Sequence, residues 1–239
     1  MENAIVMASG LGTRMRPLTE ATPKPLITVG DMPMIETVIN GLSMRGVTNI
    51  TVVVGYLGEQ FAYLKEKYNN VKLVDNTVYE IVNNISSVYA ARDVLLQGDC
   101  FICEADLYVA DPLIFQAEIV SSCYYGKMVA GHSDDWVFEL NEEGVITRVG
   151  KAGDDCYNMT GIAYFKKNEA RLLYDCIVSE YGAPGYETMF WDDVVNKHIN
   201  EFYLTVHPIT HDQIVEIDTV DELNAVRNNF SNRRYRREG

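Results

Sequence analysis

The sequence predicts an α/β protein with a Rossmann-like open sheet, mixed but mainly parallel, that carries helices on both faces. Short and wholly apolar segments alternate with amphipathic helical segments through the first half of the chain. Such continuous apolar strands are typical of a parallel sheet that is covered on both faces. A glycine-rich loop follows the first apolar segment, where an open α/β sheet places its ligands.

The first half is expected to supply the parallel strands and three of the helices. Ile35, Val38, Ile39 and Leu42 share one face of a predicted helix, and Gly46 is placed to end it. The expected strands are 4–8, 50–54, 71–74 and 101–103, and the expected helices are 34–45, 59–68 and 85–96.

The second half has a more mixed pattern. Residues 141–144 read as a hairpin turn between two strands, and Asn168 reads as the cap of a helix. The expected strands are 127–132, 136–140, 145–149 and 162–165, and the expected helices are 168–180, 191–199 and 220–228. Residues 1–228 are therefore expected to form one domain, and the basic tail 229–239 to be disordered or to begin a linker.

Composition and charge narrow the class of protein. The 239 residues are 47% hydrophobic, which suffices for one sizeable core. A net charge of −14 argues against a nucleic-acid partner, because phosphate backbones require a basic face. No apolar run approaches the ~20 residues of a membrane span, and no signal peptide is visible.

Cysteine usage indicates a reducing compartment, so we expect a cytoplasmic protein. The five cysteines are odd in number and mostly lie in apolar segments. Cys100 and Cys103 form a C-x-x-C within a predicted buried strand, and we expect two core residues rather than a redox pair or a metal site.

The loop 9–25 carries the strongest functional signal. No acidic residue lies between Asn3 and Thr19, while the loop carries Arg14, Arg16 and Lys24. It lacks the Gly-Lys-Ser/Thr ending of a Walker loop and the third glycine of a dinucleotide fingerprint, and its three prolines exclude a regular helix. A long ordered loop with an arginine fork and a lysine suits a triphosphate.

The motif Gly10-x-Gly12-Thr13-Arg14-x-x-Pro17-Leu18-Thr19, followed by Pro23-Lys24-Pro25-Leu26, resembles the signature of the sugar-nucleotidyltransferase superfamily. The resemblance implies the nucleotidyltransferase fold and a magnesium-dependent reaction. It also implies that Arg14 meets the β and γ phosphates of the nucleotide and Lys24 the α phosphate, as catalytic residues. The residues expected to bind the nucleotide are Ala8, Ser9, Gly10, Gly12, Thr13, Asn84, Ser87 and Glu104.

Two carboxylates are candidates for Mg²⁺, which prefers one or two carboxylates together with phosphate oxygens and water. Asp106 follows the strand 101–103, and the resemblance places Asp106 and Asp218 on the metal. The alternative role of Asp218 is to cap the helix 220–228. Asn84 likewise reads as the cap of the helix 85–96.

Five motifs carry a second resemblance: Asn84-Ile85-Ser86-Ser87-Val88-Tyr89, Glu104-Ala105-Asp106, Lys151-Ala152-Gly153, Phe190-Trp191-Asp192 and Glu216-Ile217-Asp218. They resemble the bacterial choline-phosphate cytidylyltransferase branch, which implies transfer of CMP from CTP to phosphocholine. A quaternary ammonium is held by aromatic faces and nearby carboxylates. Lys151 would meet the acceptor phosphate. The residues expected to bind the acceptor are Trp136, Lys151, Phe190, Trp191, Asp192 and Glu216. The alternative for each aromatic side chain is simple core packing.

Three other functions remain open at this point. A cytidylyltransferase for 2-aminoethylphosphonate or ethanolamine phosphate would use Asp192 and Glu216 more than the rings, because a primary ammonium prefers direct carboxylate bonds. A sugar-1-phosphate nucleotidyltransferase and a non-catalytic nucleotide-sensing subunit are the others. The oligomeric state and the presence of a further domain after the basic tail do not follow from the sequence.

Overall fold

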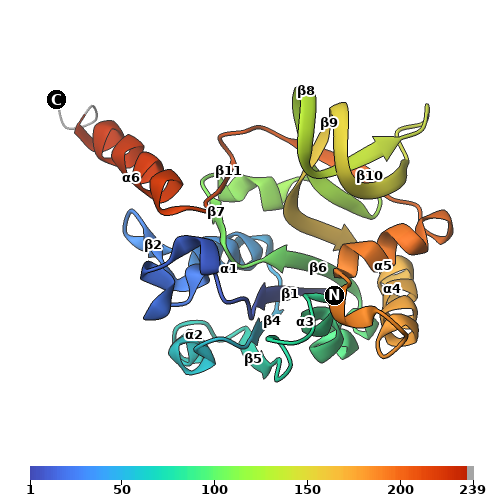
Figure 1. Cartoon of the computed structure of the whole chain (residues 1–239), viewed down its shortest axis with the longest axis horizontal. Coiled ribbons are helices and arrows are strands. Elements are labelled where there is room, and N and C mark those ends of the chain that lie inside the picture. The colour runs from blue at the N-terminus through green and yellow to red at the C-terminus, as the bar shows by residue number, and fades with distance from the viewer. Residues whose placement is uncertain (236–239) are drawn as a thin grey trace.

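A seven-stranded sheet forms the centre of the structure, a computed structural model that describes residues 1–235 (Figure 1). Its strands lie in the order β10 (Thr205–Ile209), β8 (Cys123–Leu140), β9 (Ile146–Phe165), β6 (Asp99–Glu104), β1 (Glu2–Ala8), β4 (Asn49–Val54) and β5 (Val71–Asp75). Neighbours are parallel except where β9 pairs with β6 and with β8. The predicted open, mainly parallel sheet is confirmed.

Helices cover both faces of this sheet, and the alternation of side chains along β1 explains the two cores. Val6 joins a core with residues of the first helix, whereas Ile5 packs with Val88 and Leu173 on the opposite face. The helices are α1 (Met34–Arg45), α2 (Leu64–Lys67), α3 (Ile85–Ala90), α4 (Lys167–Glu180), α5 (Trp191–Lys197) and α6 (Val220–Tyr235). Among these described helices, none is long and apolar enough to cross a membrane.

Two short ribbons complete the fold. They are β2 (Thr28–Val29) with β3 (Met32–Pro33), and β7 (Leu107–Val109) with β11 (Ile214–Glu216). The second ribbon brings the chain beyond residue 213 back to the end of β6, although these segments lie about a hundred positions apart in the sequence. The edge of the sheet that holds Asp106 therefore also receives Asp218.

Several predicted elements differ in extent. The predicted helix 59–68 is a 3₁₀ turn (Gly58–Phe61) followed by the single turn of α2, and 85–96 is α3 followed by a 3₁₀ turn (Arg92–Leu96). Asn168 does not cap α4, because the helix already begins at Lys167. α6 continues to Tyr235 instead of ending at 228, and residues 236–239 of the tail lie outside the described part.

The strands predicted at 127–132, 136–140 and 145–149 belong to one long hairpin, β8 and β9, which projects from the sheet in Figure 1. The predicted turn is confirmed, because Asn141 N–H donates to Val145 O and Gly144 N–H to Asn141 O. The hairpin bends so that Val137 pairs with both Gly150 and Asn158. Residues 156–159 form a strand segment that the sequence pattern missed, since Asp154 and Asp155 before it and Asn158 within it interrupt the apolar pattern.

The remaining predictions concern α1 and the cysteines, and the structure confirms them. Gly46 ends α1 with a φ of 91° and donates to Leu42 O. Cys100 and Cys103 are fully buried on opposite faces of β6. Burial raises the pKa of the Cys103 thiol well above its usual value, as expected for an inert core residue.

Candidate active site

The glycine-rich loop leaves the carboxyl end of β1 and crosses the end of β4 without forming an α-helix. Ser9 Oγ donates to Val53 O at 3.1 Å, and Thr19 Oγ1 donates to Gly12 O at 2.8 Å. Gly12 adopts a left-handed conformation with a φ of 60°, which favours glycine. The loop is thus a fixed structure made of short 3₁₀ turns, as its prolines predict.

A small apolar cluster joins this loop to the segment before α6. Met15 and Ile217 are fully buried and belong to the same cluster, together with Leu223 of α6. Arg14 and Asp218 are the neighbours in sequence of these two anchors. Burial of the apolar pair therefore brings the arginine and the carboxylate together at the surface.

Asp218 is free for this contact because another residue caps α6. Thr219 Oγ1 accepts from Glu222 N–H at 3.2 Å, and Glu222 Oε2 accepts from the N–H groups of Asp218 and Thr219 at 2.7 and 2.9 Å. This reciprocal arrangement is a capping box. The alternative role of the Asp218 side chain as a helix cap is therefore wrong.

Lys24 lies between the two predicted metal ligands. Its Nζ donates to Oδ2 of Asp106 and to Oδ1 of Asp218, each at 2.7 Å. Burial by itself would lower the pKa of Lys24, but the adjacent carboxylates outweigh it and raise the pKa above its usual value. The lysine is therefore held as a cation at the centre of the site.

Arg14 forms a two-bond pair with the same carboxylate. Its Nη1 and Nη2 lie 2.9 Å from Oδ2 and Oδ1 of Asp218. The Arg14 side chain is 70% exposed, so a guanidinium that can turn from a carboxylate to a bound phosphate lies at the mouth of the site.

These groups line one cavity of about 240 Å³. The predicted site residues that line it are Ala8, Ser9, Gly10, Gly12, Arg14, Lys24, Asn84, Ser87, Glu104, Asp106, Glu216 and Asp218. Met7 and Pro25 also line it and were not predicted, because an apolar strand end and a proline carry no polar signal. Thr13 does not line the cavity and lies exposed on the loop.

Glu104 lines the cavity and has several other carboxyl groups around it. Burial, followed by the charges of Asp106, Asp192 and Glu216, raises the pKa of Glu104 well above its usual value. A Cβ at Gly161 would come 2.9 Å from Glu104 Oε2, so only glycine leaves room for this carboxyl group. Glu104 therefore lies between the nucleotide loop and the carboxylates predicted for the acceptor.

Asp192 is 4% exposed and accepts a hydrogen bond from Tyr124 Oη at 3.1 Å. Burial raises its pKa to about 7. Asp192 does not line the cavity. Its charge and that of Glu216 both raise the pKa of Glu104. The sequence analysis missed Tyr124, because a tyrosine in an apolar strand is predicted to be an ordinary core residue.

The predicted aromatic residues separate into two groups. Trp191 is 3% exposed and stacks on Tyr124 with ring centroids 5.7 Å apart, so the prediction that it contacts the acceptor is wrong and core packing is right. Trp136 and Phe190 form an edge-to-face pair, with centroids 5.5 Å apart, and both are half-buried. Lys151 pairs with Trp136 across the hairpin and is exposed.

Asn84 has a different partner from the one predicted. Its side chain does not cap α3, and Oδ1 instead accepts from Trp191 N–H, the first residue of α5, at 2.9 Å. Ser87 Oγ donates to Ser9 Oγ at 3.3 Å, and Asn76 Nδ2 donates to Ser87 Oγ at 3.2 Å. Ser9 and Ser87 thus belong to one hydrogen-bonded set with Asn76, and the Asn84 side chain bonds separately to the start of α5.

Two residues missed by the sequence analysis lie close to Glu216. The charges of Lys127 and Asp135 both act on the Glu216 carboxyl group, whose pKa is raised chiefly by burial. Lys127 Nζ donates to Ile214 O at 2.6 Å, and Asn158 Nδ2 donates to Asp135 Oδ2 at 3.1 Å. Lys127 and Asp135 belong to no recognisable motif, and only the bend of the hairpin shows that they lie close to Glu216.

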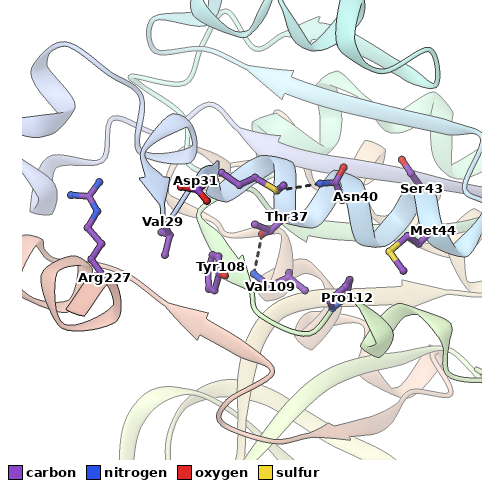
Figure 2. A pocket seen from close by; sticks show the side chains of 12 residues that line it. Val29, Asp31, Thr37, Asn40, Ser43, Met44, Tyr108, Val109, Pro112 and Arg227 are labelled. Carbon is purple, nitrogen blue, oxygen red and sulfur yellow. Dashed lines mark hydrogen bonds between the residues drawn. The ribbon is translucent and has the colours of Figure 1, made fainter. Parts of the chain in front are cut away.

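A larger cavity of about 1040 Å³ lies elsewhere, between α1, the β2–β3 ribbon and β7 (Figure 2). Its polar groups bond to the protein: Val109 N–H donates to Thr37 Oγ1 at 2.9 Å, and Asn40 Nδ2 contacts Met32 Sδ at 3.2 Å. None of the predicted site residues lines it. The smaller cavity is therefore the candidate active site.

Comparisons with known proteins show the family of the chain. A family model described as nucleotidyl transferase matches residues 3–135. A 2-aminoethylphosphonate cytidylyltransferase from Lancefieldella rimae is 56% identical over 223 residues, which cover 93% of this chain and 91% of the relative. A choline-phosphate cytidylyltransferase from Streptococcus pneumoniae is 32% identical over 92% of this chain and 94% of the relative.

A solved structure of a CTP:phosphocholine cytidylyltransferase from Streptococcus pneumoniae is similar throughout. It superposes with a TM-score of 0.87 at 30% identity, and the match covers 96% of this chain and 99% of that chain. The motifs on which the family resemblance rests therefore occur in the fold that they predict.

Proposed function

The chain belongs to the nucleotidyl transferase family, and we propose that this cytidylyltransferase transfers CMP from CTP to 2-aminoethylphosphonate. The observation that carries the acceptor is the 56% identity with the Lancefieldella rimae enzyme of that name, against 32% with the choline-phosphate enzyme. Phosphocholine, which the sequence motifs favour, becomes the second candidate, supported by the pair of rings Trp136 and Phe190.

The geometry around the expected amine supports the same preference. A trimethylammonium group is best held within several aromatic faces. Trp191 is buried against Tyr124, which leaves Trp136 and Phe190 as a single pair with their ring planes at 70°, and neither of the two lines the cavity. Carboxyl groups are more numerous nearby, and they suit a primary ammonium, which donates hydrogen bonds. Glu104 and Glu216 line the cavity and Asp135 lies close to Glu216, whereas Asp192, which was expected to bind the acceptor, is buried against Tyr124 and does not line the cavity.

The reaction needs charge neutralisation and positioning rather than a general base, because the attacking phosphonate oxygen is already ionised. That oxygen forms a bond to the α phosphorus of CTP while the bond from this phosphorus to the bridging oxygen breaks and pyrophosphate leaves. Lys24 supplies a fixed positive charge at the centre of the cavity, and Arg14 supplies a mobile one at its mouth. Both stabilise the charge that builds on the separating phosphates.

We further propose that Asp106 and Asp218 hold Mg²⁺. The two carboxylates flank Lys24 Nζ, each with an oxygen 2.7 Å from it, and their side chains are 33% and 29% exposed. Within residues 1–235 no group of three or more His, Cys, Asp or Glu side chains is arranged as a metal site. Two carboxylates fit Mg²⁺, because this ion keeps water and phosphate oxygens as its other ligands and neutralises phosphate charge.

A pyrophosphate-release assay tests the proposal. The four nucleoside triphosphates are each combined with 2-aminoethylphosphonate, ethanolamine phosphate, phosphocholine and glucose 1-phosphate. We expect CTP with 2-aminoethylphosphonate to give the highest kcat/KM. A higher value for phosphocholine would establish the second candidate, and turnover of glucose 1-phosphate alone would establish a sugar nucleotidyltransferase. No release with any pair would indicate a non-catalytic subunit.

A further inference from the structure

Asn83 lies where the nucleotide end of the active site meets the segment that carries Phe190. Asn83 and Asn84 both line a small pocket of about 120 Å³ that shares Ser9, Gly10 and Ser87 with the region of the phosphate loop. This pocket lies beside the hydrogen-bonded serines and shares Ser9, Gly10, Asn84 and Ser87, which are expected to bind the nucleotide, with the cavity of the candidate active site. Asn83 is therefore adjacent to the expected nucleotide-binding residues without belonging to the glycine-rich loop.

The same asparagine is bonded to a segment about a hundred residues away. Its backbone N–H donates to Glu187 O at 2.8 Å, and its Nδ2 donates to Thr188 O at 3.2 Å. Its Oδ1 accepts from Asn84 N–H at 2.8 Å, and Asn84 Oδ1 in turn accepts from Trp191 N–H at 2.9 Å. Two consecutive asparagines thus hold the backbone on both sides of Phe190.

The segment that they hold connects α4 to α5 and contains a 3₁₀ turn, Tyr186–Thr188, with hydrogen bonds of its own. It begins at Tyr181, which stacks on Tyr89 with ring centroids 3.7 Å apart. It ends at Phe190, whose N–H donates to Asp193 Oδ2 at 2.8 Å and whose ring meets Trp136. The bonds from Asn83 to the carbonyls of Glu187 and Thr188 attach this turn to the nucleotide side of the site.

We propose that Asn83 is a positioning residue that couples nucleotide binding to acceptor binding, an inference that rests on the proposed function. A nucleotide in the small pocket restrains the backbone and side chain of Asn83 and Asn84. Their hydrogen bonds transmit this restraint to the carbonyls of residues 187 and 188 and to the start of α5. Phe190 is then fixed against Trp136, and the wall of the acceptor pocket is complete before the acceptor arrives.

Isothermal titration calorimetry measures the coupling directly. The dissociation constant of 2-aminoethylphosphonate is determined with and without the unreactive analogue α,β-methylene-CTP. We expect the analogue to tighten acceptor binding by about tenfold, within the usual range of coupling between sites. Asn83→Ala loses the bond to Thr188 O but keeps the backbone bond to Glu187 O, so this factor should fall severalfold, and the KM for the acceptor should rise while kcat changes less.

Two further variants separate this role from a local structural one. Asn83→Asp keeps the acceptor for Asn84 N–H but cannot donate to Thr188 O, so it should weaken the coupling as Asn83→Ala does. Asn70→Ala is the matched control, because Asn70 Nδ2 likewise donates to a backbone carbonyl, that of Val47 at 2.9 Å, away from the active site. It should retain the full coupling.

The possible results distinguish this inference from the proposed function. Equal coupling in the parent and in Asn83→Ala, full coupling in Asn83→Asp, or no coupling in the parent would each overturn the role of Asn83 and leave the activity standing. If the parent turns over phosphocholine or ethanolamine phosphate instead, that compound becomes the probe in the same experiment. A parent that turns over none of the three overturns both.

Discussion

Gly12 lies directly against Lys24 across the phosphate loop. A Cβ at position 12 would come 2.9 Å from Cβ of Lys24 and 3.0 Å from Cγ2 of Thr19, and Gly12 has a φ of 60°. The glycine therefore serves two purposes: it permits the left-handed turn, and it leaves room for the stem of the lysine. This close approach sets Lys24 Nζ between Asp106 and Asp218.

Gly12→Ala should accordingly impair both stability and turnover. Gly30 offers a matched control, because it has a φ of 64° and a Cβ added there would meet no atom within 4 Å. We expect both variants to unfold at a lower temperature through backbone strain of about 1–2 kcal/mol, and Gly12→Ala also to lose turnover. Differential scanning fluorimetry and the pyrophosphate assay measure the two effects; equal kcat for both variants would contradict the contact.

Lys24→Ala should lower kcat about a hundredfold or more while the protein remains folded. The reason is that the proposed function places the Lys24 charge at the point where the phosphates separate. Lys67→Ala is the control, because Lys67 also pairs with a carboxylate, that of buried Glu36, away from the cavity. Its kcat should be close to that of the parent; an unchanged kcat in folded Lys24→Ala would refute the assignment.

Chelation by EDTA should abolish activity, and Asp106→Asn should come close to doing so, because an amide is a poorer ligand for Mg²⁺ than a carboxylate. The residual activity of Asp106→Asn should need a higher Mg²⁺ concentration for half saturation. Asp111→Asn is a suitable control, since Asp111 accepts hydrogen bonds from Leu113 N–H and Gln213 Nε2 and does not line the cavity. Full activity in excess EDTA would exclude the proposed metal.

Asp192 should make stability fall as the pH rises. Its folded-state pKa of about 7 lies above the ordinary value of 3.8, so between these values the folded state binds more protons than the unfolded state. The penalty for ionising the buried carboxyl group grows from about pH 4 to pH 7 and is then constant. Asp192→Asn removes it, so the Tm difference between variant and parent should increase over that interval. A pH-independent difference would show that Asp192 titrates normally.

Glu216→Gln and Trp136→Ala should separate the two candidate acceptors. A charge-assisted hydrogen bond contributes roughly 1.5–3 kcal/mol, and a ring contributes about 0.5–2 kcal/mol to a bound cation. For 2-aminoethylphosphonate we expect Glu216→Gln to lower kcat/KM more than Trp136→Ala does, with CTP binding little affected by Trp136→Ala. The reverse order, with phosphocholine as the better substrate, would favour the aromatic pocket.

The sequence by itself determines the features that depend on local chemistry. The apolar periodicity of α1 and Gly46 define that helix and its end, and the prolines around Lys24 exclude a helix from the phosphate loop. Arg14 and Lys24 are recognisable because they lie in a loop whose glycines and prolines suit a bound triphosphate, and Asp106 because it follows an apolar strand at the ligand-binding edge of the sheet.

The tertiary structure decides which distant residues meet and which side chains are buried. Asn84 is a residue type that commonly caps helices, and it directly precedes α3, yet its side chain bonds to Trp191, 107 positions away. Trp191 and Trp136 are the same residue type, but packing on Tyr124 buries the first while the bent hairpin leaves the second half-exposed beside Phe190. Burial and long-range hydrogen bonds depend on the packing of separate elements, so no local pattern records them.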